Sequence, residues 1–415
     1  MLMNETFATT YLDRESIPQS SLDIANRVRT NMLPWAGQFS PQLVEELLLA
    51  YGQQTGIVMD PFVGSGTSLV ESARLGKSAW GSDINPAAAI LARVYALVSV
   101  SLKNRESALN SLGSRLNEAF GPGNGPLFVE PDSAEMSRPE QESALTKLWD
   151  ESSPGVSRIL AAALIVLCDF HQRDLSPDKI FRIWLRLAET ARSLPVSSGS
   201  VVVYQADARA LPAETNSVDM VLTSPPYINV HNYHQKYRRS VEALGWNVLS
   251  LAPSEIGSNR QNRGNRFLTV IQYALDMVLA IREMARVTKP ESRLILVLGR
   301  ESTVRGVPFF NGELVAELAV RGVGLENDRR QERKFVNRYG NRIREDILHF
   351  RTSSEIPDEG ICLAAARDIA SKTLSVTRQL TETDARDGID DALERIDLVS
   401  PSPFPTDEIL SQVSS

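Results

Sequence analysis

The 415-residue sequence contains few cysteines and no long hydrophobic run, and each of these absences excludes certain classes of protein. Its two cysteines, Cys168 and Cys362, lie far apart and belong to no CxxC or Cys/His cluster, so neither a disulfide framework nor a zinc site is expected. No segment approaches the roughly 20 apolar residues of a membrane helix, and the N-terminus lacks a signal-peptide pattern. We therefore expect a cytoplasmic protein that needs no membrane and no metal.

Basic residues are also in short supply, because 44 Lys and Arg stand against 51 Asp and Glu, a net charge of −7. As an average, this charge argues against a nucleic-acid partner. The excess is local, however, since residues 351–415 hold 6 basic and 13 acidic residues and account for all of it. Charge alone therefore does not exclude DNA as a partner of the rest of the chain.

Helical and strand-like patterns alternate along the chain, which is typical of an α/β fold. We predict a mostly parallel sheet with an antiparallel end, the last two strands being 327–335 and 343–350. Helices alone are expected at 100–198, which we interpret as an insertion. The predicted units are an N-terminal segment (1–30), a catalytic domain (31–350) that contains this insertion, and an acidic C-terminal tail (351–415).

A glycine-containing turn, Asp60-Pro-Phe-Val-Gly-Ser-Gly-Thr67, follows the first predicted strand and precedes a helix. Glycines let a ligand approach the backbone closely at such a point. Leu69 stands where a dinucleotide fingerprint needs its third glycine, and no Walker lysine follows, so an NAD enzyme is disfavoured. Asp60 would suit a cationic ligand amine, as in S-adenosylmethionine. The alternative interpretation of the glycine-containing turn is a purely structural tight turn that binds no ligand.

Two more acids end the next predicted strands. Asp83 is placed to bind ribose hydroxyls, and Asp207 to accept from an adenine amino group. Each has a purely structural alternative, which is an ordinary turn aspartate for Asp83 and a helix N-cap for Asp207. Because carboxyl ends of parallel strands meet at one edge, where open α/β sheets bind ligands, we expect Asp60, Asp83 and Asp207 to lie together.

The sequence Ser224-Pro-Pro-Tyr227 directly follows the apolar strand VDMVL. Two prolines stiffen the chain and leave its carbonyls free to accept hydrogen bonds. Ser224 and the Pro225 carbonyl would accept the N–H groups of an exocyclic amine while Tyr227 stacks on the base. The predicted catalytic residues are Ser224, Pro225, Pro226 and Tyr227. Methylation of a cytosine ring carbon is not expected, because neither cysteine follows a proline.

The FxGxG motif (Phe62, Gly64, Gly66) and the SPPY motif together resemble the S-adenosylmethionine-dependent amino-methyltransferases of DNA. The segment PWAGQFSPQLVEEL also resembles a cofactor-flanking helix of that family, and the likeness covers about residues 30–350 outside the insertion. It implies a Rossmann-like methyltransferase sheet and S-adenosyl-L-methionine as the cofactor. The cofactor-binding candidates are Asp60, Phe62, Gly64, Ser65, Gly66, Thr67, Asp83 and Asp207. Serine before PPY is more typical of cytosine-N4 enzymes, whereas adenine-N6 enzymes usually carry aspartate.

DNA contact is predicted in the loop 228–266, which has a net charge of +4 and several aromatic residues. Its basic candidates are Lys236, Arg238, Arg239, Arg260, Arg263 and Arg266, interleaved with His231, Tyr233, His234, Tyr237 and Trp246. A solvated basic loop is the alternative. A second basic stretch, 321–344, contacts DNA or protects a sheet edge. The insertion has a net charge of −2, so it is interpreted as a support, with a target-reading role left open.

The sequence therefore predicts a site-specific DNA methyltransferase that acts on N4 of a flipped cytosine, in restriction-modification or phage defence, with a cognate endonuclease or defence protein as a partner. An adenine-N6 enzyme is the alternative in the same class. A noncatalytic DNA-binding or assembly subunit is the alternative in another class, and an RNA or protein amine is a more distant substrate. The acidic tail is interpreted as a solvated appendage, a partner-binding segment or a DNA-mimicking brake.

Overall fold

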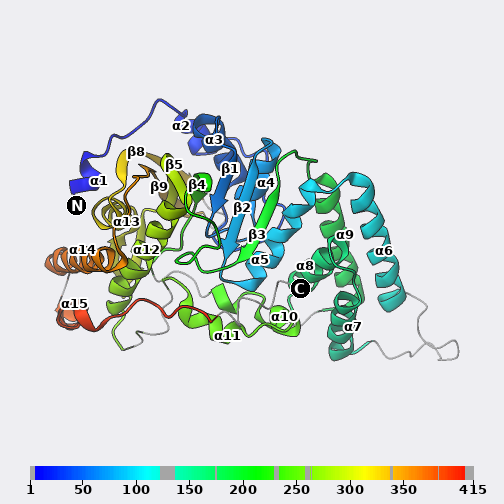
Figure 1. Ribbon diagram of the computed structural model, residues 1–415. Coiled ribbons are helices and arrows are strands. Elements are labelled where there is room, and N and C mark those ends of the chain that lie inside the picture. The colour runs from blue at the N-terminus through cyan, green and yellow to red at the C-terminus, as the bar shows by residue number, and fades with distance from the viewer. Residues whose placement is uncertain are drawn as a thin grey trace.

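A seven-stranded sheet forms the centre of the protein in the computed structural model (Figure 1). The structure describes residues 5–121, 136–172, 175–228, 233–257, 262, 264–336, 340–381 and 383–406. The strand order is β3-β2-β1-β4-β5-β9-β8, parallel from β3 to β5 and antiparallel at β9 and β8. The strands are β1 (Ile57–Asp60), β2 (Ser78–Asp83), β3 (Val201–Gln205), β4 (Val218–Thr223), β5 (Thr288–Gly299), β8 (Glu326–Val336) and β9 (Arg342–Arg351). The predicted fold class is confirmed.

Apolar helices cover both faces of this sheet. Helix α3 (Pro41–Tyr51) packs on one face, in a cluster that includes Met220 and Leu222 of β4. Helix α12 (Leu268–Val287) packs on the other face, in a cluster that includes Val221. The alternation of neighbouring β4 residues between two cores is expected of a strand buried on both sides. Two further helices, α4 (Thr67–Arg74) and α5 (Pro86–Arg93), follow β1 and β2.

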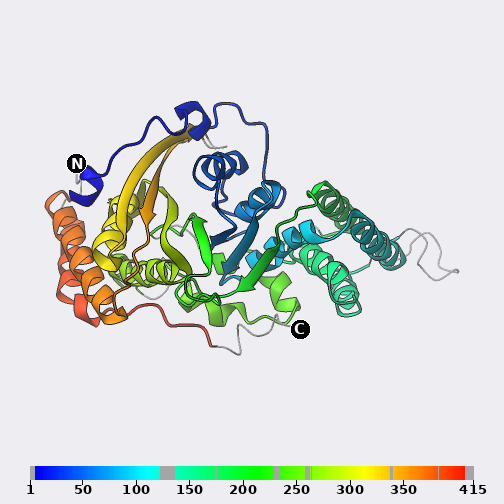
Figure 2. The same ribbon diagram turned by 45° about the horizontal axis from the view of Figure 1, so that its top comes forward.

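Four helices project beside the β3 edge (Figures 1 and 2), namely α6 (Leu102–Phe120), α7 (Arg138–Asp150), α8 (Val156–Cys168) and α9 (Pro177–Ser193). One buried arginine, Arg105, links the segments that enter and leave this group of helices. It donates to the carbonyls of Val98, Val100, Ala191, Leu194 and Pro195, and so ties the entry of the helices to their exit. Its charge lies at the C-terminus of α9, where carbonyl dipoles favour a cation.

The antiparallel end agrees with the predicted strand pair, but it is preceded by a hairpin that the sequence did not indicate. This hairpin joins β6 (Glu301–Val304) to β7 (Val307–Phe310) and leads into α13 (Asn311–Glu317). Half of the eight cations in the basic stretch 321–344 pair with acids of the protein itself, namely Arg321, Arg329, Arg330 and Arg333. Lys334, Arg342 and Arg344 are exposed, and Arg338 lies outside the described residues. Edge protection and DNA contact therefore both stay predictions for this stretch.

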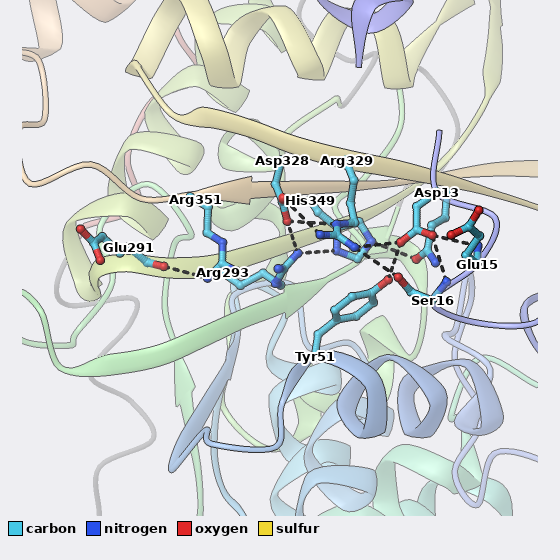
Figure 3. A network of polar contacts seen from close by, with 11 residues as sticks. Asp13, Glu15, Ser16, Tyr51, Glu291, Arg293, Asp328, Arg329, His349 and Arg351 are labelled. Atoms are coloured by element: carbon cyan, nitrogen blue, oxygen red, sulfur yellow. Dashed lines mark hydrogen bonds and ion pairs between the residues drawn. The ribbon is translucent and has the colours of Figure 1, made fainter. Parts of the chain in front are cut away.

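The N-terminal segment covers the β8 edge and is held there by a polar network (Figure 3). Leu12 forms a bridge with Arg330, while Asp13 accepts hydrogen bonds from Arg329 at 3.0 Å and from Tyr51 at 3.2 Å. Burial and the neighbouring arginines lower the pKa of His349 in this network to about 3. The segment thereby removes an exposed strand edge.

The C-terminal residues are not an appendage over their described part. Helix α14 (Glu359–Gln379) lies against α12, and its Cys362, Ile369 and Leu374 are fully or almost fully buried in the same core cluster. Helix α15 (Thr383–Glu394) and a 3-10 turn, η5 (Ile396–Leu398), follow it. Of the three alternatives for the tail, the solvated appendage is therefore wrong for these helices, while the boundaries of the domains stay a prediction. Within the described chain, no helix combines the length and apolarity that a bilayer crossing requires.

Candidate functional site

A cavity opens at the carboxyl ends of the parallel strands. Strand order reverses here between β1 and β4, so the cavity lies at the topological switch point of the sheet. Nine of the twelve predicted catalytic and cofactor-binding residues line it: Asp60, Phe62, Gly64, Ser65, Thr67, Asp83, Asp207, Ser224 and Pro226. The other three, Gly66, Pro225 and Tyr227, are not among its lining residues. The structure thus brings the two motifs together, while the role of each residue stays a prediction.

The glycine turn has a backbone that other residues adopt with difficulty. Gly64 and Gly66 both have positive φ angles, of 51° and 91°. A Cβ atom on Gly66 would lie only 2.6 Å from the Tyr95 ring, and one on Gly64 would lie 2.9 Å from Trp35. Both glycines are therefore required by backbone conformation and by packing, and the turn presents its backbone to the cavity.

Asp60 links the glycine turn to the SPPY motif. It is 2% exposed and accepts hydrogen bonds from the Ser68 hydroxyl at 2.5 Å, the Thr223 hydroxyl at 2.5 Å and the Phe62 amide at 3.1 Å. Burial raises the pKa of Asp60 to about 6, although these donors favour its ionised form. Because Thr223 directly precedes Ser224, one carboxylate holds both halves of the site.

Asp83 lines the cavity together with Glu255. Its oxygens accept from the amides of Gly64 at 3.0 Å and Asn85 at 2.9 Å, which fixes the carboxylate at the end of β2. Burial raises the pKa of Asp83 to about 7, and the negative charges of Asp60 and Glu255 act in the same direction.

Asp207 lines the cavity, but its carboxylate has a partner that the sequence did not suggest. The Arg209 side chain donates to both Asp207 oxygens, from Nε at 3.0 Å and from Nη2 at 2.6 Å. The side chains of both residues are buried. A carboxylate retains further lone pairs after these bonds, so the predicted contact with adenine is compatible with them.

The SPPY motif is fixed by bonds to β5 and α12. The Ser224 hydroxyl donates to the Val297 carbonyl at 2.9 Å, and the Tyr273 hydroxyl donates to the Pro226 carbonyl at 3.0 Å. The Tyr227 ring lies on Gly299, where an added Cβ would be 2.8 Å from a ring carbon. Burial raises the pKa of Tyr227 far above its usual value, so its hydroxyl stays protonated.

Two functional candidates, Trp35 and Glu255, escaped the sequence analysis, and Tyr233 was expected on the DNA-facing loop and not in the cavity wall. The Trp35 and Tyr233 rings stack with centroids 6.4 Å apart, and both line the cavity. Glu255 lines it too and bonds to the buried His234 at 2.7 Å. The PWAGQFS segment, already noted for its resemblance, was the available signal for Trp35. No local pattern marks Glu255, which lies 28 residues after Tyr227 in sequence.

The cavity has a strongly negative lining. Asp60, Asp83, Asp207 and Glu255 contribute to it, whereas its described lining includes no lysine, arginine or histidine. Such a site attracts a cation and disfavours the pyrophosphate of a dinucleotide. The carboxylates can also accept hydrogen bonds from ribose hydroxyls and an exocyclic amine, so this set of acceptors fits S-adenosylmethionine. Over the same described part of the chain, no cluster of three or more His, Cys, Asp or Glu residues could hold a metal ion.

The loop 228–266 differs from the predicted DNA-facing surface. Its Tyr237 and Trp246 are buried, and Trp246 donates to Gln205 at 2.8 Å, so neither is available to stack on a base. This part of the prediction is wrong, because short helices fold the loop into the protein. The helices are η2 (Tyr233–Gln235), α10 (Arg238–Ala243), α11 (Val248–Leu251) and η3 (Ala252–Ser254). They place Tyr233, Ser254 and Glu255 in the cavity wall.

The basic residues of this loop contact the protein itself where they are described. Lys236 lies 5.3 Å from the Trp35 ring centroid, Arg238 pairs with Glu242, and Arg239 pairs with Glu142 of α7. Arg266 is half-buried immediately before α12. Arg260, Arg263 and His231 lie outside the described residues.

Comparisons with known proteins bear on the N-terminal part of the catalytic domain. The sequence model of a family described as DNA methylase, covering N6 and N4 enzymes, matches residues 17–93. The type II methyltransferase M.MjaII of Methanocaldococcus jannaschii is 43% identical over 61 residues, which are 15% of this chain and only 12% of that protein. The matched part includes the glycine turn and Asp83.

Solved structures add only a distant likeness of fold. A S-adenosylmethionine-dependent methyltransferase of Methanosarcina mazei is 15% identical, with a TM-score of 0.32 over 74% of this chain and 98% of that one. TrmN from Thermus thermophilus is also 15% identical, with a TM-score of 0.32 over 76% and 50%. These scores are too low to bear on function. The family match supports S-adenosylmethionine as the cofactor, and over residues 17–93 it confirms the resemblance to the DNA amino-methyltransferases.

Proposed function

We propose that the protein is a S-adenosylmethionine-dependent DNA methyltransferase that methylates an exocyclic amine, N4 of cytosine, within a short sequence. The observation that carries this proposal is the Ser224 hydroxyl at the wall of the acidic cavity. Its proton is directed to the Val297 carbonyl, so its oxygen can accept an N–H from a neutral amine. A hydroxyl at this position, rather than a carboxylate, favours cytosine N4 over adenine N6.

S-adenosylmethionine would supply an electrophilic methyl group and leave as a neutral thioether. The protein's own contribution is orientation. Ser224 and the Pro225 carbonyl would accept the two N–H bonds, which turns the nitrogen lone pair toward the methyl donor. Tyr227 would stack on the base, although neither Tyr227 nor Pro225 is among the residues that line the cavity. Once methylated, the amine nitrogen loses its extra proton to water.

The amine of a paired base is not accessible in duplex DNA, so the proposal includes base flipping. Flipping costs a few kcal/mol, which phosphate contacts and stacking must offset. The candidates for phosphate contact remain Lys236, Arg238, Arg239, Arg260, Arg263 and Arg266. Arg238 and Arg239 have side-chain exposures of 32% and 49%, and surface ion pairs such as theirs are weak enough to be exchanged for phosphate. The proposal extends to a restriction-modification or defence role in the cytoplasm, with an endonuclease partner; a likeness of 61 residues to a type II methyltransferase is compatible with that role.

The test is to incubate the protein with unmethylated DNA and methyl-labelled cofactor, digest the DNA to nucleosides and identify the labelled one by mass. Labelled N4-methyl-2′-deoxycytidine is expected. Labelled N6-methyl-2′-deoxyadenosine would overturn the base assignment alone, and no label with intact cofactor binding would favour a noncatalytic subunit. Ser224→Ala should lower the rate at least 100-fold with cofactor affinity within about threefold. Ser198→Ala, an exposed serine outside the cavity lining, is the matched control.

A further inference from the structure

The last described residues of the chain reach the core beside the cofactor cavity. We call residues 400–404 the strap; they follow η5 and lead away from α15 toward α11 (Figure 1). Ser402 donates to both oxygens of Asp276 in α12, from its amide at 2.8 Å and from its hydroxyl at 2.7 Å. Ser402 and Asp276 are both buried, so these bonds are shielded from water. The strap is thus anchored to a central helix of the domain.

Arg209 joins the strap to the cavity wall. Its Nη1 donates to Asp276 at 2.8 Å and to the Ser402 carbonyl at 2.6 Å, and its Nη2 donates to the Pro403 carbonyl at 3.1 Å. The Phe404 ring covers the guanidinium, with its centroid 4.4 Å from the central carbon. The same guanidinium holds both oxygens of Asp207, which lines the cavity. The Arg209 side chain is fully buried, so its orientation is set by these partners alone.

Two carboxylates share this one cation, because Nε and Nη2 of Arg209 donate to Asp207 while Nη1 donates to Asp276. Asp276 needs donors because it is completely buried, and Ser402 supplies two of them. Without the strap, Asp276 would draw the guanidinium toward itself, and the two strap carbonyls that hold Arg209 near Asp207 would be lost. The strap therefore favours the arrangement in which Arg209 faces Asp207.

We propose that the strap is part of the cofactor site, because by clamping Arg209 it holds the Asp207 carboxylate in place to accept the 6-amino group of the cofactor's adenine. This inference rests on the proposed function. It assigns a role to the acidic C-terminal region, and it makes Arg209 and Ser402 positioning residues rather than catalytic ones.

The experiment compares two ligands by calorimetry on the full-length protein and on strap variants. The ligands are S-adenosylhomocysteine and S-inosylhomocysteine, in which an oxygen replaces the 6-amino group. The full chain should bind the adenosyl ligand at least tenfold more tightly than the inosyl ligand. In the inosyl ligand, the Asp207 carboxylate would face an oxygen atom that has no hydrogen to donate. A chain ending at Val399 should lose most of this preference, whereas a chain ending at Thr406, which retains the strap, should keep it.

Ser402→Ala and Phe404→Leu provide the test if the chain ending at Val399 does not fold, and each should lower the preference at least threefold. A simple loss of stability would weaken both ligands equally, so the ratio of the two Kd values separates positioning from folding. An unchanged ratio in folded strap variants would overturn the inference and leave the proposed function intact. Equal binding of both ligands by the full chain would also overturn it, and failure to bind S-adenosylhomocysteine at all would overturn the proposed function with it.

Discussion

Cofactor affinity should depend on pH in the neutral range, because two cavity acids have raised pKa values. Burial raises the pKa of Asp83 to about 7 and that of Asp60 to about 6. A cationic ligand with hydroxyl donors binds the ionised carboxylates, so binding requires each acid to lose its proton. The affinity for S-adenosylmethionine should therefore rise as pH increases from 6, and it should level off above the pKa of Asp83.

The size of the effect follows from the two pKa values. At pH 6 about one Asp83 in eleven and one Asp60 in two are ionised, whereas at pH 7.5 both are mostly ionised. The product of these fractions changes by about 15-fold, which is equivalent to about 1.6 kcal/mol. Asp83→Asn should reduce the pH effect to about twofold, the part that Asp60 contributes.

Isothermal titration calorimetry at pH 6.0, 6.5, 7.0 and 7.5 measures this dependence. The range ends there because the ligand's own α-amino group titrates near pH 8. Repeating the titration at pH 7 in buffers with different ionisation enthalpies should reveal the release of about half a proton per ligand bound. A Kd that stays constant between pH 6 and 7.5, with no proton release, would refute the reasoning by showing that the acids are ionised before the ligand arrives.

Three further predictions concern single side chains. Thr223→Val removes the donor at 2.5 Å from Asp60 and should destabilise the fold by about 1.5–3 kcal/mol in urea unfolding, whereas Thr223→Ser should be nearly neutral. Arg105→Met leaves the carbonyls at the base of the insertion without their donor and should cost about 3 kcal/mol or more, against less than about 1 kcal/mol for the surface variant Arg115→Met. Glu255→Gln should weaken the binding of S-adenosylmethionine about fivefold, and it should weaken the binding of S-adenosylhomocysteine by a smaller factor because that ligand lacks the sulfonium charge. Equal losses for the two ligands would show that the charge of Glu255 does not contribute to binding.

Much of the sheet could be predicted because its strands are short, apolar and bounded by turn residues. Strand β4 is an example, since VDMVL stands between Ser217 and the two prolines. The hairpin of β6 and β7 was missed, because its residues alternate weakly and its turn, at Arg305 and Gly306, lacks an Asn-Gly or Asp-Gly signal. The antiparallel end was predictable from its two long strand-like segments.

The candidate site was predictable where its residues are adjacent in sequence to strand ends. Asp60, Asp83 and Ser224 directly end or follow strands, so the geometry of a parallel sheet brings them together without further information. Glu255 could not be found in this way, because its position depends on how the preceding short helices fold back. Charge and aromatic content predicted an exposed loop there, but composition does not distinguish a Trp246 that stacks on DNA from one that packs in the core.

The acidic C-terminal region shows the same difficulty most clearly. The charged side chains of this region lie on the exposed faces of its helices. On α15, for example, Asp390 pairs with Arg378 and Asp391 pairs with Arg395. The opposite faces of α14 and α15 are apolar and belong to the main core, so a net charge of −7 coexists with tight packing. The contact by which the strap holds Arg209 joins residues 193 positions apart, Ser402 and Arg209, and such a pairing leaves no local pattern. Because the partners of a buried polar group are set by topology, only the folded chain shows that a segment with the composition of a tail completes a binding site.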